Sequence, residues 1–313
     1  MTDKNNCLLE VKDLKTSFFT SKGEVKAVNG VSFHVDRGEV VAIVGESGCG
    51  KSVTQMSIMQ LVQSPPGKIL GGEVFFEGKN LLEYKSNSRE MRDIRGNKIA
   101  MIFQEPMTAL DPVMTIGNQL IEVIRTHRNV SKKEALMIAE EALDAVGIPD
   151  AKSRLSNYPF EMSGGMRQRV MIATAVACNS ELLIADEPTT ALDVTTQAQV
   201  MELLVDIVRK RNMSMIIVTH NLGVVNRYAD RIYVMYAGHV VEQGTTEQIL
   251  KNPRHPYTNG LLASVPKLEE EDGEKLIPIP GTPPNLTDFP DECPFIPRCK
   301  YVCDKCKTSK MPP

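Results

Sequence analysis

Short apolar runs alternate with longer segments of helical periodicity through most of the chain. The apolar runs are rich in Ile, Val and Met and end at turn-forming residues, as buried strands do. They are EVVAIVGESG (39–48), KIAMIFQ (98–104), LLIADE (182–187), MSMIIVTH (213–220) and RIYVMYAG (231–238). The pattern between them predicts helices over 51–62, 114–127, 131–146, 164–179, 195–211 and 221–228.

Strands that alternate with helices predict an α/β fold with a largely parallel sheet and helices on both faces. The segment from about 105 to 175 is mostly helical and interrupts this rhythm, so we expect an inserted helical subdomain. Within it, SKKEALMIAEEALDAVG carries a complete set of helix signals. Ser131 is the predicted N-cap, Glu134 completes a capping box, and Gly147 ends the helix.

The pattern changes after about residue 250. NPRHPYTNGLLASVP is rich in proline, KLEEEDGEK is an acidic linker, and IPIPGTPPNLTDFPDECP reads as extended. We therefore predict a main domain over 1–252 and a small tail over 253–313. The tail holds few apolar residues, so we expect a metal to stabilise it.

Composition narrows the class of protein. The net charge is −3, so no overall positive field favours nucleic acid. The beginning, MTDKNN, has no apolar signal core, and no window approaches the eighteen apolar residues that span a bilayer. We expect an intracellular protein, in which clustered cysteines more often bind metal than form structural disulfides.

GESGCGKS, at 45–52, fits the phosphate-binding pattern G-x-x-x-x-G-K-[ST]. The glycines let backbone N–H groups turn toward phosphates, and the following helix adds the positive end of its dipole. Lys51 is expected to reach the β- and γ-phosphates, and the Ser52 hydroxyl to bind Mg²⁺. The predicted nucleotide-binding residues of this loop are Gly45, Glu46, Ser47, Gly48, Cys49, Gly50, Lys51, Ser52 and Val53.

Two carboxylates end the run LLIADE, about 135 residues after the loop. Adjacent strand residues face opposite ways, so the two side chains should have different roles. We expect Asp186 to hold Mg²⁺, directly or through water. Glu187 is expected to face the γ-phosphate and polarise the attacking water.

The sequence CPFIPRCKYVCDKC, at 293–306, holds four of the seven cysteines with the spacing C-x₅-C-x₃-C-x₂-C. Four thiolates suit tetrahedral zinc or a [4Fe–4S] cluster. The spacing is neither that of a zinc ribbon nor the usual ferredoxin run.

With these motifs in this order, residues 7–250 resemble the ATP-binding subunits of ABC transporters. SGGMRQR (163–169) is similar to the family's LSGGQ signature, although Met162 replaces the first Leu and Met166 replaces Gln. The resemblance makes Ser163, Gly164 and Gly165 a second phosphate-binding turn. It also matches Gln104 to the Q-loop, Asp193 of TALD to the D-loop and His220 to the switch histidine. Phe18 or Phe19 stands where the family places an aromatic residue that stacks on adenine.

The resemblance implies that two such subunits enclose two ATP molecules head to tail. Each ATP then contacts the phosphate loop of one chain and the SGG turn of the other. Lys51, Mg²⁺, His220 and the partner's turn would stabilise in-line attack of water on the γ-phosphate. Gln104 joins Ser52 and Asp186 as an expected Mg²⁺ ligand.

The tail resembles that of importer ATPases for oligopeptides, dipeptides and nickel, through NPRHPYTNGLLASVP, GTPPNL and CPFIPRC. This implies a peripheral subunit at the cytoplasmic face of the membrane. Its expected partners are a second, homologous ATPase, two membrane permeases and an extracellular substrate-binding protein. The alternative substrate is nickel or another metal chelate. A third hypothesis is a soluble ABC ATPase that has no role in transport.

The same resemblance associates Cys293, Cys299 and Cys306 with an iron–sulfur cluster, which makes [4Fe–4S] the expected metal. Cys303 is a candidate fourth ligand, and in many relatives a further cysteine lies beyond the point where this chain stops. Zinc, and a tail without metal, remain the alternatives.

Overall fold

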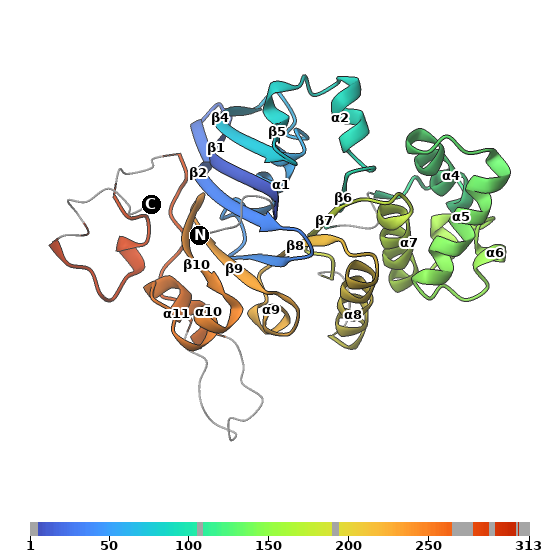
Figure 1. Ribbon diagram of the computed structural model, residues 1–313. Helices are drawn as coiled ribbons and strands as arrows, with labels where there is room; N and C mark the ends of the chain where they lie inside the picture. Colours follow the sequence, from blue (N-terminus) through green and yellow to red (C-terminus); the bar gives the residue numbers. More distant parts are fainter. Residues whose placement is uncertain are drawn as a thin grey trace. The chain divides into compact units, whose positions relative to one another are not determined.

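The structure is a computed structural model that describes residues 6–104, 109–189, 194–264, 278–287, 292–304 and 306 (Figure 1). The chain divides into two compact units. The first unit comprises residues 1–83 and 217–313, and the second comprises residues 84–216. Among the described residues, no helix combines the length and the hydrophobicity needed to cross a bilayer.

The first unit contains two groups of strands and a set of short helices. Its elements are β1 (Cys7–Thr20), β2 (Gly23–Asp36), β3 (Val40–Val44), α1 (Lys51–Ile58), β4 (Gly67–Phe76), β5 (Lys79–Asn80), η1 (Leu81–Glu83), α9 (Leu222–Tyr228), β9 (Arg231–Tyr236), β10 (His239–Thr245), α10 (Thr246–Lys251), α11 (Pro256–Ala263) and η3 (Ile296–Arg298).

The second unit is mainly helical and holds a pair of strands. Its elements are α2 (Arg89–Ile94), β6 (Ile99–Ile102), α4 (Ile116–His127), α5 (Lys132–Ala145), α6 (Ala151–Arg154), η2 (Pro159–Glu161), α7 (Gly164–Val176), β7 (Leu182–Asp186) and α8 (Val194–Lys210). Strand β8 (Ser214–Thr219) begins in this unit and ends in the first.

An antiparallel sheet with the order β2-β1-β4-β5 lies in the first unit (Figure 1). The largely parallel sheet predicted from the apolar runs did not include it. The reason is physical: β1 mixes buried, half-buried and exposed positions without a regular alternation and has several register shifts. A strand buried on one face gives a weaker apolar signal than a strand buried on both.

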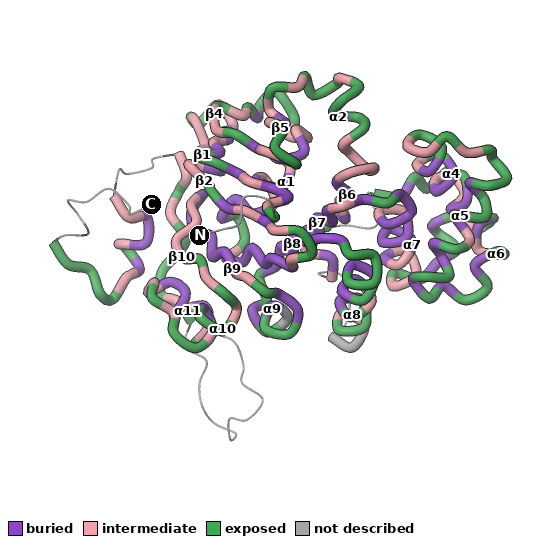
Figure 2. Tube along the Cα trace, viewed as in Figure 1, coloured by how far each residue is buried: buried purple, intermediate pink, exposed green. Residues whose placement is uncertain are grey.

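The other strands include both orientations. β3 pairs in parallel with β9, while β10 runs antiparallel to β9. In the second unit, β6 and β7 are parallel. Every residue of β3, β7 and β8 is buried, in agreement with their continuous apolar runs (Figure 2). The printed pairs among the predicted strands, β3 with β9 and β6 with β7, are therefore parallel as expected, and antiparallel pairing enters with β10 and the β2-β1-β4-β5 sheet, which the apolar runs did not predict.

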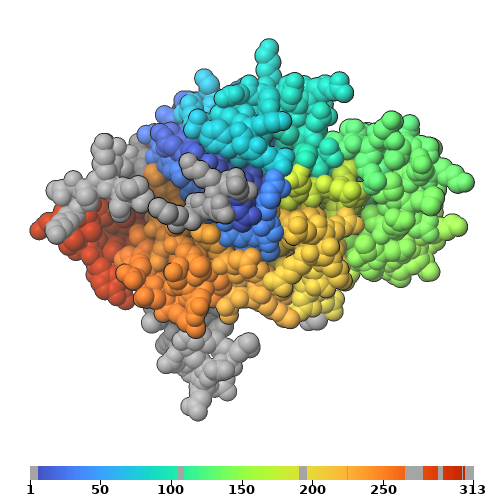
Figure 3. All heavy atoms as spheres, in the orientation of Figure 1, coloured from blue at the N-terminus to red at the C-terminus, as the bar shows by residue number. Residues whose placement is uncertain are grey.

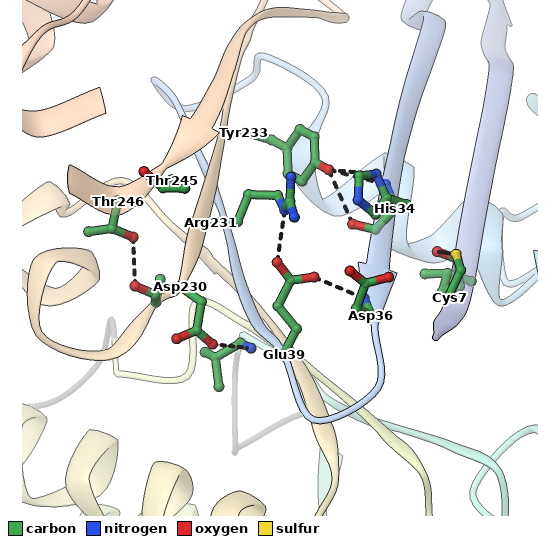
Figure 4. Close-up of polar contacts among 12 residues, drawn as sticks. Cys7, His34, Asp36, Glu39, Asp230, Arg231, Tyr233, Thr245 and Thr246 are labelled. Atoms are coloured by element: carbon green, nitrogen blue, oxygen red, sulfur yellow. Dashed lines mark hydrogen bonds and ion pairs between the residues drawn. The ribbon is translucent and has the colours of Figure 1, made fainter. Parts of the chain in front are cut away.

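Polar contacts join the amino-terminal ends of β3 and β9 (Figure 4). The Nε atom of Arg231 donates to Oε1 of Glu39 at 2.8 Å, and the other oxygen of Glu39 accepts from the backbone N–H of Asp36. The Asp230 carboxylate accepts from the N–H of Val40 at 2.8 Å. These contacts set the register of β3, from whose opposite end the phosphate-binding sequence follows.

The six predicted helices are confirmed as α1, α4, α5, α7, α8 and α9, with ends that differ by a few residues. The capping box of α5 is present, since Ser131 and Glu134 each bond the other's backbone N–H. α5 packs against α4, α6 and α7. The helical subdomain over 105–175 stays a prediction, as do the domain boundaries at 252 and 253.

The proline-rich stretch after residue 250 is not wholly extended. It contains α11, in which Pro256 occupies the first turn and His255 is the N-cap. Proline is well tolerated there because that N–H has no partner within the helix. Further along, Phe295 is 3% exposed and packs with Tyr257 and Leu261 of α11. The described tail residues therefore lie within the first unit, beside α11 (Figure 3).

Candidate functional site

The phosphate-binding sequence forms a tight loop between β3 and α1. Gly50 precedes the helix with a φ of 103°, and a Cβ atom there would lie 2.2 Å from the carbonyl oxygen of Ala27. Only glycine fits this position without strain. The conformation of the loop therefore depends on the close approach of the Gly50 and Ala27 backbones, which a side chain at position 50 would prevent.

The ammonium group of Lys51 turns back onto the loop. Its Nζ atom donates to the carbonyl oxygens of Gly45 at 2.8 Å and Glu46 at 3.0 Å, and the residue is 5% exposed. These two carbonyls accept hydrogen bonds that Lys51 could otherwise donate to phosphate oxygens. Ser52 and Val53 follow in the first turn of α1 and are half-buried.

Cys49 lies inside the loop and is 5% exposed. Burial is the main cause that raises the pKa of its thiol. A thiol held protonated is a poor nucleophile, so Cys49 contributes packing and backbone rather than covalent chemistry.

Two further predicted residues belong to the first unit. His220 is exposed and directly follows β8, and the next residue, Asn221, caps α9. Phe18 is half-buried in β1, opposite Val25 of β2 and Gly67 of β4. Phe19, the alternative adenine-stacking residue, is 51% exposed.

In the second unit, the structure brings Gln104 and Glu187 together. Ile102 of β6 pairs with Ala185 of β7, and continuing this register by two residues places Gln104 opposite Glu187. The Nε2 atom of Gln104 donates to Oε2 of Glu187 at 3.0 Å. Asp186, one residue earlier, is 5% exposed at the end of β7. The two carboxylates therefore have different surroundings, as the strand pattern predicted.

The predicted second phosphate-binding turn lies at the start of α7. Ser163 is the N-cap, and its side chain accepts from the N–H of Met166 at 3.3 Å. Ser163 and Gly164 are exposed, while Gly165 is half-buried. A thirteen-residue helix thus presents its amino terminus to solvent. Asp193, the predicted D-loop residue, lies outside the described residues.

The tail cysteines do not form the predicted four-thiolate site. The Sγ atoms of Cys303 and Cys306 are 3.6 Å apart, and Sγ of Cys299 accepts from the N–H of Tyr301. Burial raises the pKa of Cys293. Within the described part of the chain, no three His, Cys, Asp or Glu side chains gather as a metal site would require.

Sequence reasoning missed two tail residues that contact the phosphate-binding loop. The hydroxyl of Tyr257 accepts from the N–H of Glu46 at 2.8 Å, and Arg298 forms an ion pair with the Glu46 carboxylate. The sequence did hold a signal for Arg298, because it is the single cationic residue within CPFIPRC. Its partner is more than 250 residues away in sequence, so no local pattern could identify it.

Two family models match the chain. One, described as ABC transporter, matches residues 28–190, and the other, described as oligopeptide/dipeptide transporter, C-terminal region, matches residues 241–306. Residues 293–306, with all four tail cysteines, lie within the second match.

Curated relatives and solved structures agree with these matches. The oligopeptide transport ATP-binding protein OppD of Bacillus subtilis is 55% identical over 94% of this chain and 82% of its own length. The dipeptide transport ATP-binding protein DppD of the same organism is 52% identical over 95% and 89%. A dimeric, post-hydrolysis structure of the ATP-binding cassette MJ0796, bound to ADP and Pi, has a TM-score of 0.68 at 27% identity. That alignment covers 76% of this chain and 98% of the cassette.

Proposed function

The chain belongs to the ATP-binding subunits of ABC transporters, in the group that carries the oligopeptide/dipeptide transporter C-terminal region. On this premise, we propose that it hydrolyses ATP to drive the import of oligopeptides or dipeptides. One observation carries the proposal: a glycine-rich phosphate loop with a buried lysine lies in a chain 55% identical to an oligopeptide transport ATP-binding protein.

The loop from Gly45 to Val53 is proposed to hold the ATP phosphates. On binding ATP, the ammonium group of Lys51 would release its hydrogen bonds to the carbonyls of Gly45 and Glu46. It would donate instead to oxygens of the β- and γ-phosphates. Phosphate oxygens carry negative charge and form stronger bonds with an ammonium group than neutral carbonyls do. Phe18 is the proposed adenine contact.

The carboxylates at the end of β7 supply the chemistry. Asp186 is proposed to hold Mg²⁺ together with Ser52 and Gln104, and Mg²⁺ when bound neutralises phosphate charge. Glu187 would orient and polarise the attacking water, and Gln104 already bonds its carboxylate. His220 is the proposed contact to the γ-phosphate.

Ser163, Gly164 and Gly165 are proposed to act on the ATP of a partner subunit. Support comes from the exposure of Ser163 and Gly164 at a helix amino terminus, where backbone N–H groups favour anions. The dimeric state of the similar cassette also supports it. Asp193, which lies outside the described residues, stays a proposed nucleotide-binding residue.

The proposed partners are a second, homologous ATPase, two membrane permeases and an extracellular substrate-binding protein. They would hold this chain at the cytoplasmic face of the membrane as a peripheral subunit. A groove in the second unit supports a permease contact, because it is lined by Ala100, Met101, Phe103, Leu110, Met114 and Met171. Phe103 is 43% exposed, and a helix of a permease with apolar side chains would cover it.

The [4Fe–4S] cluster, with zinc as the alternative, has no support from the described side chains, which do not fit a metal site. No step of the proposed function depends on it. Iron, sulfide and zinc measured per chain after purification without oxygen would test the expectation. About four irons with matching sulfide would show that the tail thiols close around a cluster.

Peptide uptake by the assembled transporter tests the proposal. We expect uptake and ATP hydrolysis to be lost with Lys51→Ala and retained with Lys251→Ala. Lys251 is a matched control, since its ammonium group lies on α10 in an exposed ion pair with Glu247. Hydrolysis coupled to uptake of nickel, with none of peptide, would replace the peptide assignment with the alternative substrate.

A further inference from the structure

A buried arginine of the tail holds the phosphate-binding loop. Arg298 is 7% exposed and ends η3. Two of its nitrogens contact the Glu46 carboxylate: Nη1 donates to Oε2 at 2.7 Å, and Nη2 donates to Oε1 at 3.0 Å. This is a bidentate pair, the strongest common geometry for an arginine and a carboxylate.

The remaining donors of Arg298 also have acceptors. Nε donates to the carbonyl oxygen of Pro280 at 2.9 Å, Nη1 reaches the hydroxyl of Tyr236 at 3.3 Å, and Nη2 reaches the carbonyl oxygen of Ile279 at 3.4 Å. All five N–H groups of the guanidinium are therefore used. A lysine has three donors and no planar fork, so it could not reproduce this set.

Aromatic rings enclose the ion pair. The guanidinium carbon lies 5.8 Å from the ring centre of Tyr236 and 6.0 Å from that of Phe295. Tyr236 contacts Phe295 edge-on and also packs against Tyr257. Apolar surroundings lower the local dielectric and strengthen the pair, but they also make an unpaired charge there costly.

Glu46 connects this cluster to the lysine that is proposed to bind phosphate. Its N–H donates to the Tyr257 hydroxyl, and its carbonyl oxygen accepts from Nζ of Lys51. Arg298 holds the carboxylate of the same residue. The tail thus fixes both the backbone and the side chain of the second residue of the loop. Pro283, Pro284 and Leu286 line a small pocket with the same loop.

We propose that Arg298 is a positioning residue for ATP, which acts through Glu46 to keep the phosphate-binding loop in the conformation that receives the phosphates. The inference rests on the proposed function, because it assumes that ATP binds this loop. A loop held in advance loses less conformational freedom on binding, which favours affinity. The bidentate contact between Arg298 and Glu46 is called the clamp below. Its loss should therefore weaken ATP binding, while the hydrolytic step at Glu187 is left intact.

Charge-conserving variants of the full chain test this inference. Arg298→Lys and Glu46→Asp keep the charge near the phosphates but break the bidentate geometry. We expect each to weaken equilibrium binding of a fluorescent ATP analogue by roughly 5- to 150-fold, the usual range for coupling between sites. The double variant should weaken binding by less than the product of the two single effects, because both break one contact.

An exposed ion pair elsewhere in the first unit, between Lys251 and Glu247, provides the matched control. Lys251→Arg and Glu247→Asp make the same kind of change in α10, where the pair is 2.8 Å long and both side chains are about three-quarters exposed. We expect no change in ATP affinity there. In the assembled transporter, Arg298→Lys should raise the KM for ATP and leave kcat close to wild type.

Two results separate the possible failures. If the wild-type chain does not bind ATP, or if Lys51→Ala binds it equally well, the proposed function fails. If the wild type binds ATP and the folded clamp variants bind it with unchanged affinity, only the inference is overturned, and Arg298 is a structural contact of the tail.

Thermal unfolding without nucleotide shows which variants are folded. Should Arg298→Lys unfold, Glu46→Asp decides alone, since its carboxylate is 27% exposed and tolerates change better.

Discussion

Lys51 and Glu187 illustrate how single residues prepare the chemistry. Lys51 has its ammonium group bound to two loop carbonyls, so its charge is already directed into the loop. Glu187 has a φ of 46°, in the left-handed region that non-glycine residues seldom adopt. Strained backbone of this kind often occurs at functional positions, where the surrounding structure holds it in place. Its bond from Gln104 helps to orient the carboxylate.

Glu187→Gln should lower ATP turnover by about 10²- to 10⁴-fold, the usual contribution of a general base. ATP binding should remain, because the phosphate loop is unchanged. Hydrolysis and nucleotide affinity, measured on the assembled transporter, check both expectations. Glu141→Gln, on the exposed face of α5, is the control and should behave as wild type. Near-normal turnover of Glu187→Gln would rule out its role as the base.

Gly50→Ala should destabilise the chain by at least about 1–3 kcal/mol, the cost of a strained backbone, with the contact to Ala27 in addition. Thermal unfolding measures the loss. Gly71→Ala is a suitable comparison, because a Cβ atom there meets nothing within 4 Å. Equal stability of the two variants would contradict the close approach described for Gly50.

At the scale of elements, the strand β9 connects distant parts of the first unit. Its first residues bond the segment before β3, and its last residue, Tyr236, contacts the tail. The turn that follows leads to His239 at the start of β10, whose Nε2 atom lies 3.3 Å from the side-chain amide nitrogen of Asn29 on β2. β9 thereby couples the position of the phosphate loop to both the antiparallel sheet and the tail.

His239 makes stability depend on pH. Burial lowers its pKa from the usual 6.5 to about 4. Between these values the unfolded chain binds the proton more readily than the folded chain. The contribution of His239 to the free energy of unfolding is therefore fully present above pH 6.5 and is lost as the pH falls toward 4. The slope from one group is at most about 1.4 kcal/mol per pH unit. Thermal unfolding from pH 7 to 4 should show a smaller decline for His239→Gln than for wild type, and parallel curves would contradict this.

Helix α7 offers a test of the partner contact. Ser163→Ala removes the N-cap hydroxyl, which should cost about 1 kcal/mol of stability and impair hydrolysis at the partner's ATP rather than at this chain's own. Site-resolved nucleotide trapping in the assembled transporter distinguishes the two sites. Ser131→Ala, the N-cap of α5, removes an equivalent cap and should leave turnover unchanged. Impairment of this chain's own site would overturn the proposed arrangement.

At the scale of the whole molecule, the described part of the tail packs within the first unit, against β9 and α11. The described side chains do not gather into a metal site, whereas Phe295 and Tyr257 bury almost their entire surfaces together. The tail was expected to need a metal because its own apolar content is low. Its described residues share an apolar core with β9 and α11, which supplies packing that the tail's own composition does not. Its contact with Glu46 then links this packing to the nucleotide site.

The sequence by itself determined the elements whose signals are local. Continuous apolar runs predicted β3, β6, β7, β8 and β9, helical periodicity predicted the longer helices, and GESGCGKS identified the phosphate-binding loop. These signals depend on spacing along the chain, so no tertiary contact is needed to detect them. The antiparallel sheet was missed because β1 mixes buried and exposed positions and its pairing is interrupted by register shifts, so it carries no continuous apolar run.

Only the tertiary structure decided which distant residues meet. Gln104 bonds Glu187 because parallel pairing of β6 and β7 aligns their ends, and Arg298 bonds Glu46 because the tail packs beside the phosphate-binding loop within the first unit. Among the described residues, the tail thiols do not gather in the metal-binding group that their spacing suggested. Contacts of this kind depend on packing among segments tens to hundreds of residues apart, and a linear pattern carries no record of that packing.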